Sequence, residues 1–184
     1  MSARTLIENW LSQTSLAAGG VRTLDTNGFW TVPYGRITLT LAVPDGEPFF
    51  VLYAPLMSVS GGSEQTLSRF YRRLLVWQLQ GDLPTGMAFG MDYDGSLVSV
   101  VGQYRTQGLD AASFDALLRE TAAGAEALRS RLETLFVELA TQEKASGPES
   151  RMPAGTGQED SSFSDHELLQ ARLLQARLLQ GTPH

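Results

Sequence analysis

Apolar and polar residues alternate strictly over residues 36–43, with Ile37, Leu39, Leu41 and Val43 on one side. Successive side chains of a strand point to opposite faces of a sheet, so this period of two predicts a half-buried strand. Residues 44–48, Pro-Asp-Gly-Glu-Pro, have the chemistry of a turn. Residues 49–54 are nearly all apolar, which indicates a central strand. The pattern therefore predicts an antiparallel hairpin over residues 36–54.

Two further strand pairs are predicted from the same kind of pattern. Residues 87–93 alternate apolar and polar, Asp94-Gly95 supplies a two-residue turn, and residues 97–104 form the return strand. Residues 21–25 and 29–32 are short strand-like runs on either side of Asn27-Gly28. Asn-Gly favours a type I′ turn, which needs positive φ at both central residues, so a hairpin is expected here as well.

Phe29 and Trp30 are adjacent, so their rings must point to opposite faces of a strand. If one face belongs to the core, the other ring is at least partly exposed. This points to a binding surface. The alternative is that the second ring is covered by the first helix.

The first and last helices are expected at residues 3–11 and at residues 110 to about 140. In the first helix, capped by Ser2, Leu6 and Trp10 belong to one apolar stripe. That stripe either packs on the sheet or leaves a patch around Trp10 open for a partner. In the last helix, Asp110 or Ser113 caps the start, and Gly124 lowers the stability by about 1 kcal/mol relative to Ala.

The helix expected at residues 64–80, capped by Ser63, has more apolar surface than one sheet face can cover. Its apolar side chains span roughly 200° at about 100° per residue, and a helix on one sheet face needs about half of that. They are Leu67, Phe70, Tyr71, Leu74, Leu75, Trp77 and Leu79, with Val76 beside them. The surplus predicts burial on two sides, by the sheet and by a second subunit. The alternative is that the long last helix covers it.

The composition changes beyond residue 141. Residues 143–164 are rich in Gly, Pro and Ser without apolar periodicity, so disorder is expected. A five-residue unit, Leu-Leu-Gln-Ala-Arg, then repeats from Leu168. A period of five scatters the leucines around a helix instead of forming a stripe. The chain thus divides into a domain at residues 1–142 and a flexible tail at residues 143–184. The domain is of the α+β class, with an antiparallel sheet of about five strands and three helices in the order α-β-β-β-α-β-β-α.

The charge and composition limit the classes of partner and chemistry that are expected. The 184 residues carry a net charge of −6 with a sequence pI of about 4.9. An acidic surface repels phosphate backbones, which argues against nucleic acid. No cysteine is present, so disulfides and thiolate chemistry are excluded. Neither a secretory signal nor a membrane-spanning run is recognised, and a cytoplasmic location is expected.

Candidate catalytic chemistry is weak. Both histidines, His166 and His184, lie in the tail, which excludes a Ser-His or His-metal site in the folded domain. The Ser-Gly-Gly-Ser run ending at Ser63 lacks the Gly-Lys-Ser/Thr ending of a phosphate loop. Asp92 and Asp94 lie at a hairpin turn, where an Asp side chain commonly stabilises the turn by a hydrogen bond to the nearby backbone. We expect no enzyme, no cofactor and no metal. A small enzyme whose carboxylates meet only in three dimensions is the remaining catalytic alternative.

The order of elements, in a small acidic chain, resembles the class I type III secretion chaperones, the family of the Tir chaperone. The similarity extends over residues 6–139. The segments that carry it are LIENWL, ITLTLAVPDGEPFFVLYAPL, LSRFYRRLLVWQL, MAFGMDYDGSLVSVVGQY and LLRETAAGAEAL. The resemblance implies a homodimer in the cytoplasm of a Gram-negative bacterium. It also implies an ATP-independent chaperone that keeps effectors secretion-competent and escorts them to the export apparatus, with the secretion ATPase as a further partner.

The resemblance also implies site residues. An effector's N-terminal segment would bind in extended form, through apolar grooves and strand addition to a sheet edge. The implied effector-binding residues are Leu6, Trp10, Phe29, Trp30 and Val32. The implied dimer-interface residues are Leu67, Phe70, Tyr71, Leu74, Leu75, Trp77 and Met91. The alternative function is a non-catalytic adaptor that binds folded proteins through its apolar surface or through the Leu-Leu-Gln-Ala-Arg helix.

Overall fold

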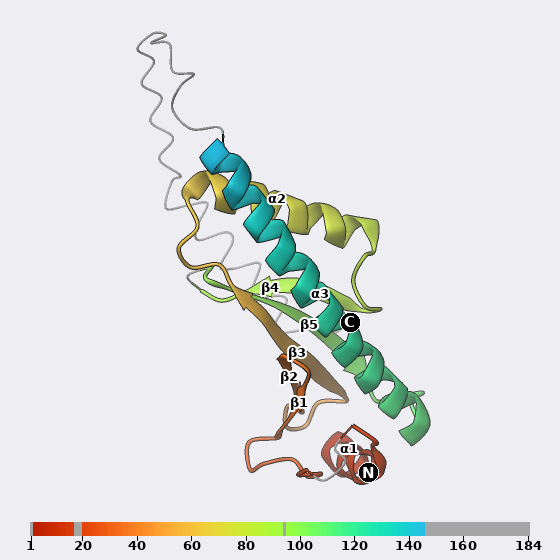
Figure 1. Ribbon diagram of the computed structural model, residues 1–184. Helices are drawn as coiled ribbons and strands as arrows, with labels where there is room; N and C mark the ends of the chain where they lie inside the picture. Colours follow the sequence, from red (N-terminus) through yellow and green to blue (C-terminus); the bar gives the residue numbers. More distant parts are fainter. Residues whose placement is uncertain (1, 17–19, 94, 146–184) are drawn as a thin grey trace. The chain divides into compact units, whose positions relative to one another are not determined.

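The computed structural model describes residues 2–16, 20–93 and 95–145. It has three helices and five strands in the predicted α-β-β-β-α-β-β-α order, so the α+β class is confirmed (Figure 1). The helices are α1 (Ala3–Gln13), α2 (Glu64–Gln80) and α3 (Ala111–Ala145). The strands are β1 (Phe29–Tyr34), β2 (Ile37–Ala42), β3 (Phe49–Ser58), β4 (Met87–Met91) and β5 (Leu97–Arg105). Everything predicted for residues 146–184, including the Leu-Leu-Gln-Ala-Arg repeat, lies outside the described residues.

The five strands form one antiparallel sheet in the order β1-β2-β3-β5-β4. Both hairpins predicted at residues 36–54 and 87–104 are confirmed. β3 pairs with β2 on one side and with β5 on the other, as its apolar sequence predicts for a central strand. Burial alternates along β3 because one sheet face is covered and the other is not. The edges of the sheet are β1 and β4.

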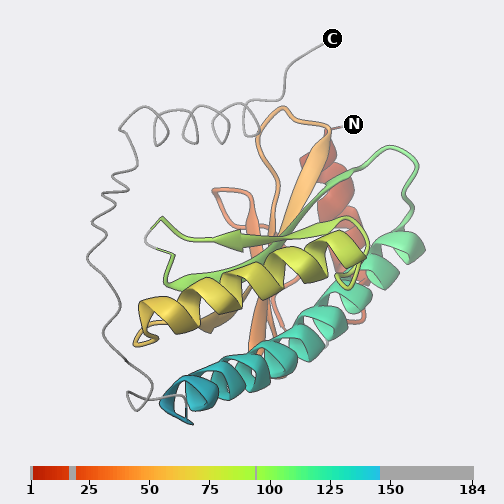
Figure 2. The ribbon, with the colours of Figure 1, turned by 90° about the horizontal axis from the view of Figure 1, so that it is seen from above.

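The helices cover one sheet face and close the core. α2 and α3 lie side by side along that face (Figure 2), and α1 packs at the N-terminal end of α3. The ring of Phe114 on α3 lies 5.2 Å from Trp10 of α1 and 5.5 Å from Phe50 of β3, centroid to centroid. The Phe70 ring of α2 meets Phe136 of α3 at 5.4 Å. Aromatic contacts therefore join the three helices to the sheet.

The helix caps follow the sequence closely. The side chains of Ser2 and Ser63 accept hydrogen bonds from backbone N–H groups three residues on, as predicted for both N-caps. Asp110 caps α3 by accepting from Ser113 N at 2.8 Å. α3 continues to Ala145, about five residues beyond its predicted end.

The predicted strand at residues 21–25 is wrong, and with it the type I′ hairpin across Asn27-Gly28. Asp25 Oδ1 accepts from the N–H groups of Asn27 and Phe29, which forms a local turn instead. Positive φ is confined here to Gly28, whereas a type I′ turn needs it twice. β1 instead turns at Gly35 and pairs with β2, while Leu24 is buried in the core.

Candidate functional site

α2 has three distinct sides. Phe70 and Leu74 are buried against α3 and the sheet, so the last helix covers this part of the apolar surplus. Leu75 and Leu79 are 63% and 87% exposed and lie one turn apart on a second side. The third side carries arginines. The apolar surface of α2 therefore exceeds what its own subunit covers, although by less than the sequence pattern suggests.

The seven predicted dimer-interface residues occupy different environments in the subunit. Phe70 and Leu74 are buried, Leu67, Tyr71 and Trp77 are half-buried, and Leu75 and Met91 are exposed. Leu79 and Tyr93 have exposed fractions of 87% and 91% and were not among the seven residues. The signal for Leu79 was its spacing of four from Leu75, and the signal for Tyr93 was its alternation with Met91.

α2 packs beside the β4–β5 hairpin through two side-chain hydrogen bonds. Tyr71 donates its hydroxyl to Gly95 O at 2.8 Å, and Gln78 Oε1 accepts from Phe89 N at 3.0 Å. Around the helix, Leu75 lies about 40° from Tyr71 and about 60° from Gln78, next to the side that bonds this hairpin. Exposed apolar side chains from α2 and the hairpin thus share one part of the molecule. We define the α2–β4 surface by Leu75, Leu79, Met91 and Tyr93.

The β4 edge is partly closed within the subunit. In an antiparallel ladder, alternate residues direct their N–H and C=O groups away from the paired strand. Asp92 N donates to Leu97 O, so Asp92 and every second residue before it on β4 face β5. The residues between them, Met87, Phe89 and Met91, therefore direct their backbone groups outward. Met87 N donates to Pro84 O at 3.0 Å, and Phe89 N donates to Gln78. These bonds occupy two donors that another chain would otherwise use in strand pairing.

The predicted effector-binding residues lie around β1 and α1, and they differ in accessibility. Trp10, Trp30 and Val32 are buried, and Leu6 is half-buried. Phe29 is 45% exposed on the sheet face that the helices leave open. Trp30 donates its indole N–H to Val21 O at 2.7 Å in the opposite direction. The two adjacent rings thus point to opposite faces, as the sequence predicts.

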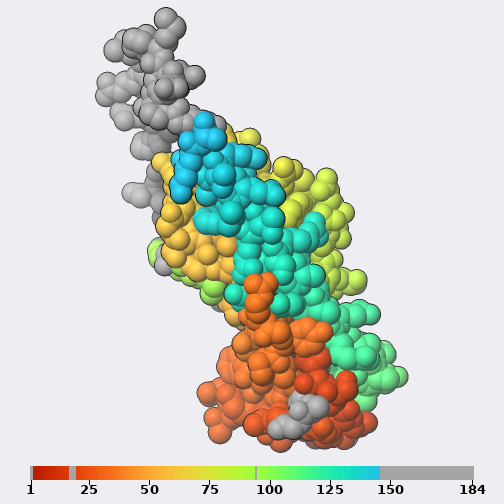
Figure 3. Space-filling view, viewed as in Figure 1, coloured from red at the N-terminus to blue at the C-terminus, as the bar shows by residue number. Residues whose placement is uncertain are grey.

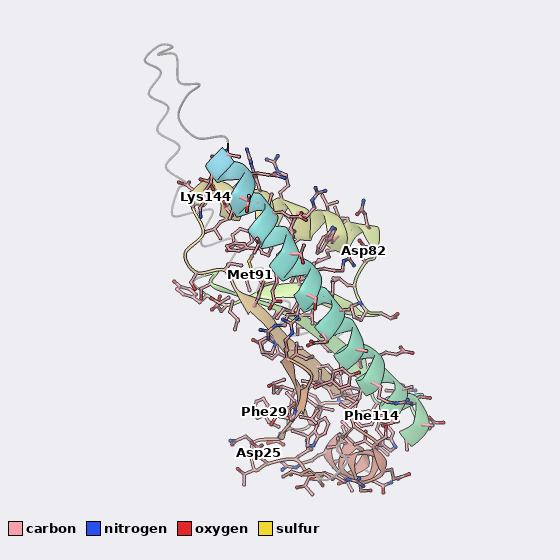
Figure 4. All side chains as sticks on the ribbon, in the orientation of Figure 1. Asp25, Phe29, Asp82, Met91, Phe114 and Lys144 are labelled. Carbon is pink, nitrogen blue, oxygen red and sulfur yellow. The ribbon has the colours of Figure 1, made fainter. Side chains whose placement is uncertain are left out.

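The β1 edge is accessible over a short length. Val43 N donates to Gly28 O, so Gly28 and every second residue after it face β2. Phe29, Thr31 and Pro33 lie between these residues and therefore direct their backbone groups outward. Asp25 already pairs with both backbone groups of Phe29, through Asp25 N to Phe29 O and Phe29 N to Asp25 Oδ1, each at 2.8 Å. Proline has no N–H to donate. The outward N–H of Thr31 and the carbonyls of Thr31 and Pro33 form what we call the open β1 edge. Figure 4 shows Asp25 and Phe29 close together, well away from Met91.

An ion-pair network fixes the β1–β2 turn on α3. Arg36 bonds Glu133 at 2.8 Å and Glu126 at 3.3 Å, and Arg129 bonds Glu133 at 2.9 Å. Hydrogen bonds from Arg129 and Arg36 lower the pKa of Glu133, and the same network raises the pKa of Arg36. The network holds the end of β1 in a defined position, which an edge strand needs if it is to pair with a partner.

Residues 6–129 match the profile of the Tir chaperone protein (CesT) family. The chain belongs to this family. It is therefore a type III secretion chaperone, a class of protein that binds effectors and does not catalyse a reaction. No curated protein matches the chain.

The chain is similar to chains in three solved structures of protein complexes. The ExsC–ExsE complex contains a chain with a TM-score of 0.55 and 18% identity, covering 72% of this chain and 97% of that chain. The ExoU–SpcU complex from the type III secretion system of Pseudomonas aeruginosa has a TM-score of 0.47 and 17% identity, covering 70% and 96%. The ExoT–SpcS complex from Pseudomonas aeruginosa has a TM-score of 0.45 and 19% identity, covering 68% and 97%.

Within the described part of the chaperone, no helix combines the length and the apolar character needed to cross a bilayer. The capping of the sheet edges by Asp25, Gln78 and Pro84 was missed by sequence reasoning. The bonds of Asp25 and Pro84 belong to local turns that the sequence pattern did not indicate, whereas the bond of Gln78 depends on where the chain folds back.

Proposed function

We propose that the chaperone is a cytoplasmic homodimer that binds the N-terminal segment of one or more effectors in extended form. Bound in this way, an effector stays secretion-competent and is escorted to the export apparatus, where the secretion ATPase is the receiving partner. No nucleotide is consumed by the chaperone itself. The observation that carries the proposal is the exposed apolar surface left on α2 after its core side is packed.

The dimer is proposed to form through the α2–β4 surface. Leu75 and Leu79 are exposed on a helix whose next side is fully packed, and Met91 is half exposed beside them. Each large apolar side chain that a partner buries contributes about 1.5–3 kcal/mol. In a two-fold dimer every such contact occurs twice, so a small patch on one subunit is sufficient. The half-buried predicted residues Leu67, Tyr71 and Trp77 would flank this contact.

The effector is proposed to bind along the open β1 edge and over Phe29. Backbone hydrogen bonds at Thr31 would hold an extended segment without regard to its sequence, and the exposed ring of Phe29 would contact its apolar side chains. Leu6 and the buried Trp10, Trp30 and Val32 are proposed to support this surface from beneath. The Arg36 network keeps the strand in place before the effector arrives.

The dimer is tested by light scattering coupled to size exclusion. Two chains of 20.0 kDa give a mass of about 40 kDa. We expect Leu75→Glu to yield the monomer mass, because it places a charge in the apolar contact. Val137→Glu on α3 is the matched control, since Val137 is 64% exposed and outside the α2–β4 surface. A wild-type monomer at micromolar concentration would refute the dimer.

Effector binding is tested at Thr31. Thr31→Pro removes the outward N–H of the open β1 edge, and Thr31→Val changes the side chain but keeps that N–H. The effector is first identified as the protein whose secretion is lost when this chaperone is deleted from its bacterium. We expect that effector to co-purify with Thr31→Val and to be lost from Thr31→Pro. Equal co-purification with both variants would show that strand addition at β1 is not used.

A further inference from the structure

The third side of α2 carries three arginines that form no close ion pair in the described part of the chaperone. Arg69, Arg72 and Arg73 are all exposed. Among residues 2–16, 20–93 and 95–145, none of their guanidinium groups lies within 4.0 Å of a carboxylate. The pKa of Glu143 is lowered mainly by hydrogen bonds from Ser63 and Thr66, and to a smaller extent by the charge of Arg69 at longer range. Like charges at spacings of three and four residues repel along a helix. These three neighbouring arginines lack a close ion pair although the net charge of the chain is −6.

The arginines line a groove between α2 and α3. One part of it, of about 340 Å³, is lined by Arg69, Arg72, Arg73, Val76, Leu139 and Gln142. It therefore combines three guanidinium groups with two aliphatic side chains and contains no carboxylate. Figure 3 shows the face on which α2 and α3 meet.

The groove continues along the helices into a second hollow. This hollow, of about 470 Å³, shares Arg73 and adds Trp77, Leu135, Glu138 and Arg131. Arg131 stacks over the Trp77 ring at 4.5 Å and bonds Asp82 at 3.4 Å, so its charge is already partnered. The arginines without a close ion pair therefore lie toward the other end, where Glu64 and Glu143 line an adjoining hollow together with Arg69 and Arg72. An elongated groove with charge at one end fits a peptide segment better than a small ion.

Most of this groove lies away from the two surfaces assigned above. At about 100° per residue, Arg69 and Arg73 point about 80–160° away from Leu75 and Leu79 around α2, whereas Arg72 lies only about 20° from Leu79. The β1 edge lies at the far edge of the sheet from the β4 strand that α2 accompanies. A ligand held mainly by Arg69 and Arg73 would therefore leave room for both a second subunit and an effector.

We propose that the α2–α3 groove binds an acidic segment of a partner protein. Carboxylates of the segment pair with Arg69, Arg72 and Arg73, and interspersed apolar side chains contact Val76 and Leu139. Guanidinium groups bind carboxylates through two parallel hydrogen bonds, which gives such a contact direction as well as attraction. The chaperone's overall negative charge repels acidic chains elsewhere, so the groove is where one would be retained.

The test uses the full-length chaperone and a fluorescein-labelled peptide of repeated Glu-Glu-Leu units. A second peptide, in which every Glu is replaced by Gln, measures the apolar contribution alone. Fluorescence anisotropy at low and physiological salt gives the dissociation constants. We expect the Glu peptide to bind at least tenfold more tightly than the Gln peptide, and to weaken as salt rises.

The matched variants are Arg73→Glu and Arg105→Glu. Both change the net charge equally, but Arg105 is an exposed residue at the end of β5, outside the groove. We expect Arg73→Glu to weaken the Glu peptide at least tenfold and Arg105→Glu to change it less than twofold. Equal weakening by both variants, or equal binding of both peptides, would overturn the proposal.

Three other occupants are distinguished by the anisotropy assay together with light scattering. If inorganic phosphate displaces the Glu peptide at the peptide's own concentration, the groove is a simple anion site and the proposal fails. If Arg73→Glu dissociates a wild-type dimer in light scattering, the groove is a subunit interface and the proposal fails. The chain has its own acidic run at residues 159–167. The run is neutralised by replacing its Glu residues with Gln and its Asp residues with Asn. If this variant binds the Glu peptide more than tenfold more tightly, the run itself occupies the groove and the proposal also fails.

Discussion

Gly124 in the middle of α3 provides a sharp test of the packing between α3 and the loop before β4. A Cβ atom added at Gly124 would lie 2.5 Å from Pro84 Cγ. Non-bonded carbon atoms prefer a separation of about 3.5–4.0 Å. A glycine that looks like a weak point in the helix is therefore the residue that lets Pro84 approach it.

The expected magnitude combines two opposing terms. Ala in place of Gly within a helix stabilises by about 1 kcal/mol, through backbone entropy. Forcing a methyl group into an occupied site costs about 1–3 kcal/mol. We therefore expect Gly124→Ala to lower the free energy of unfolding by about 1 kcal/mol, opposite in sign to its effect in an isolated helix.

A second substitution isolates the contact. Pro84→Ala removes the Cγ atom and leaves Cβ, which lies 3.5 Å from the added methyl group, an ordinary contact distance. Alone it should destabilise by about 0.5–1 kcal/mol, because the unfolded chain gains freedom. The double variant should regain nearly wild-type stability, with a coupling free energy of about 1–2 kcal/mol.

The assay is urea unfolding of the wild type, both single variants and the double variant, followed by far-ultraviolet circular dichroism. All four must be compared at one protomer concentration, because association adds to apparent stability. If Gly124→Ala raises stability by about 1 kcal/mol, helix propensity decides and the close approach of Pro84 is not tight. Additive effects in the double variant would likewise refute the reasoning.

Two further predictions concern side chains that accept hydrogen bonds from the backbone of another segment. Asp115 accepts from Thr14 Oγ1 at 2.6 Å and Ser15 N at 2.9 Å; burial acts to raise its pKa, but these bonds outweigh burial and lower it. A carboxyl whose pKa is lower in the folded state stabilises the fold at pH values above its unfolded-state pKa, and this stability is lost as the pH falls through its folded-state pKa. We therefore expect Asp115→Asn to lower the free energy of unfolding by about 1–2 kcal/mol near neutral pH, and progressively less below about pH 4, as measured by urea unfolding. A difference that does not change with pH would contradict this. Gln78→Ala should expose the Phe89 amide and speed its hydrogen exchange about fivefold, since the bond is worth about 1 kcal/mol; Gln80→Ala, on the same exposed helix, is the control and should leave that amide unchanged.

Much of the fold could be predicted from the sequence, because its signals are local. A period of two along residues 36–43 specifies a strand wherever it lies, and Ser63 caps a helix through its own neighbours. The order of elements and both long hairpins were accordingly predictable. The exception near Asn27-Gly28 is also local, since the side chain of Asp25 competes for the turn.

The candidate site was predictable only in part. The pattern predicted surplus apolar surface on α2, and it predicted that the rings of Phe29 and Trp30 point to opposite faces of the sheet. The structure has both features. The pattern did not predict that Phe70 is buried while Leu75 is exposed, because the exposure of each side chain depends on where α3 lies against α2.

Local turns and tertiary packing together decided which parts of each surface are accessible. Asp25 caps part of the β1 edge, Gln78 and Pro84 cap the β4 edge, and α3 forms the second wall of the arginine groove. Each of these depends on residues that approach through the fold or through a turn. Periodicity specifies which face of an element is apolar, because backbone geometry repeats along the chain. What covers that face is a matter of packing between elements, and the packing exists only after the chain has folded.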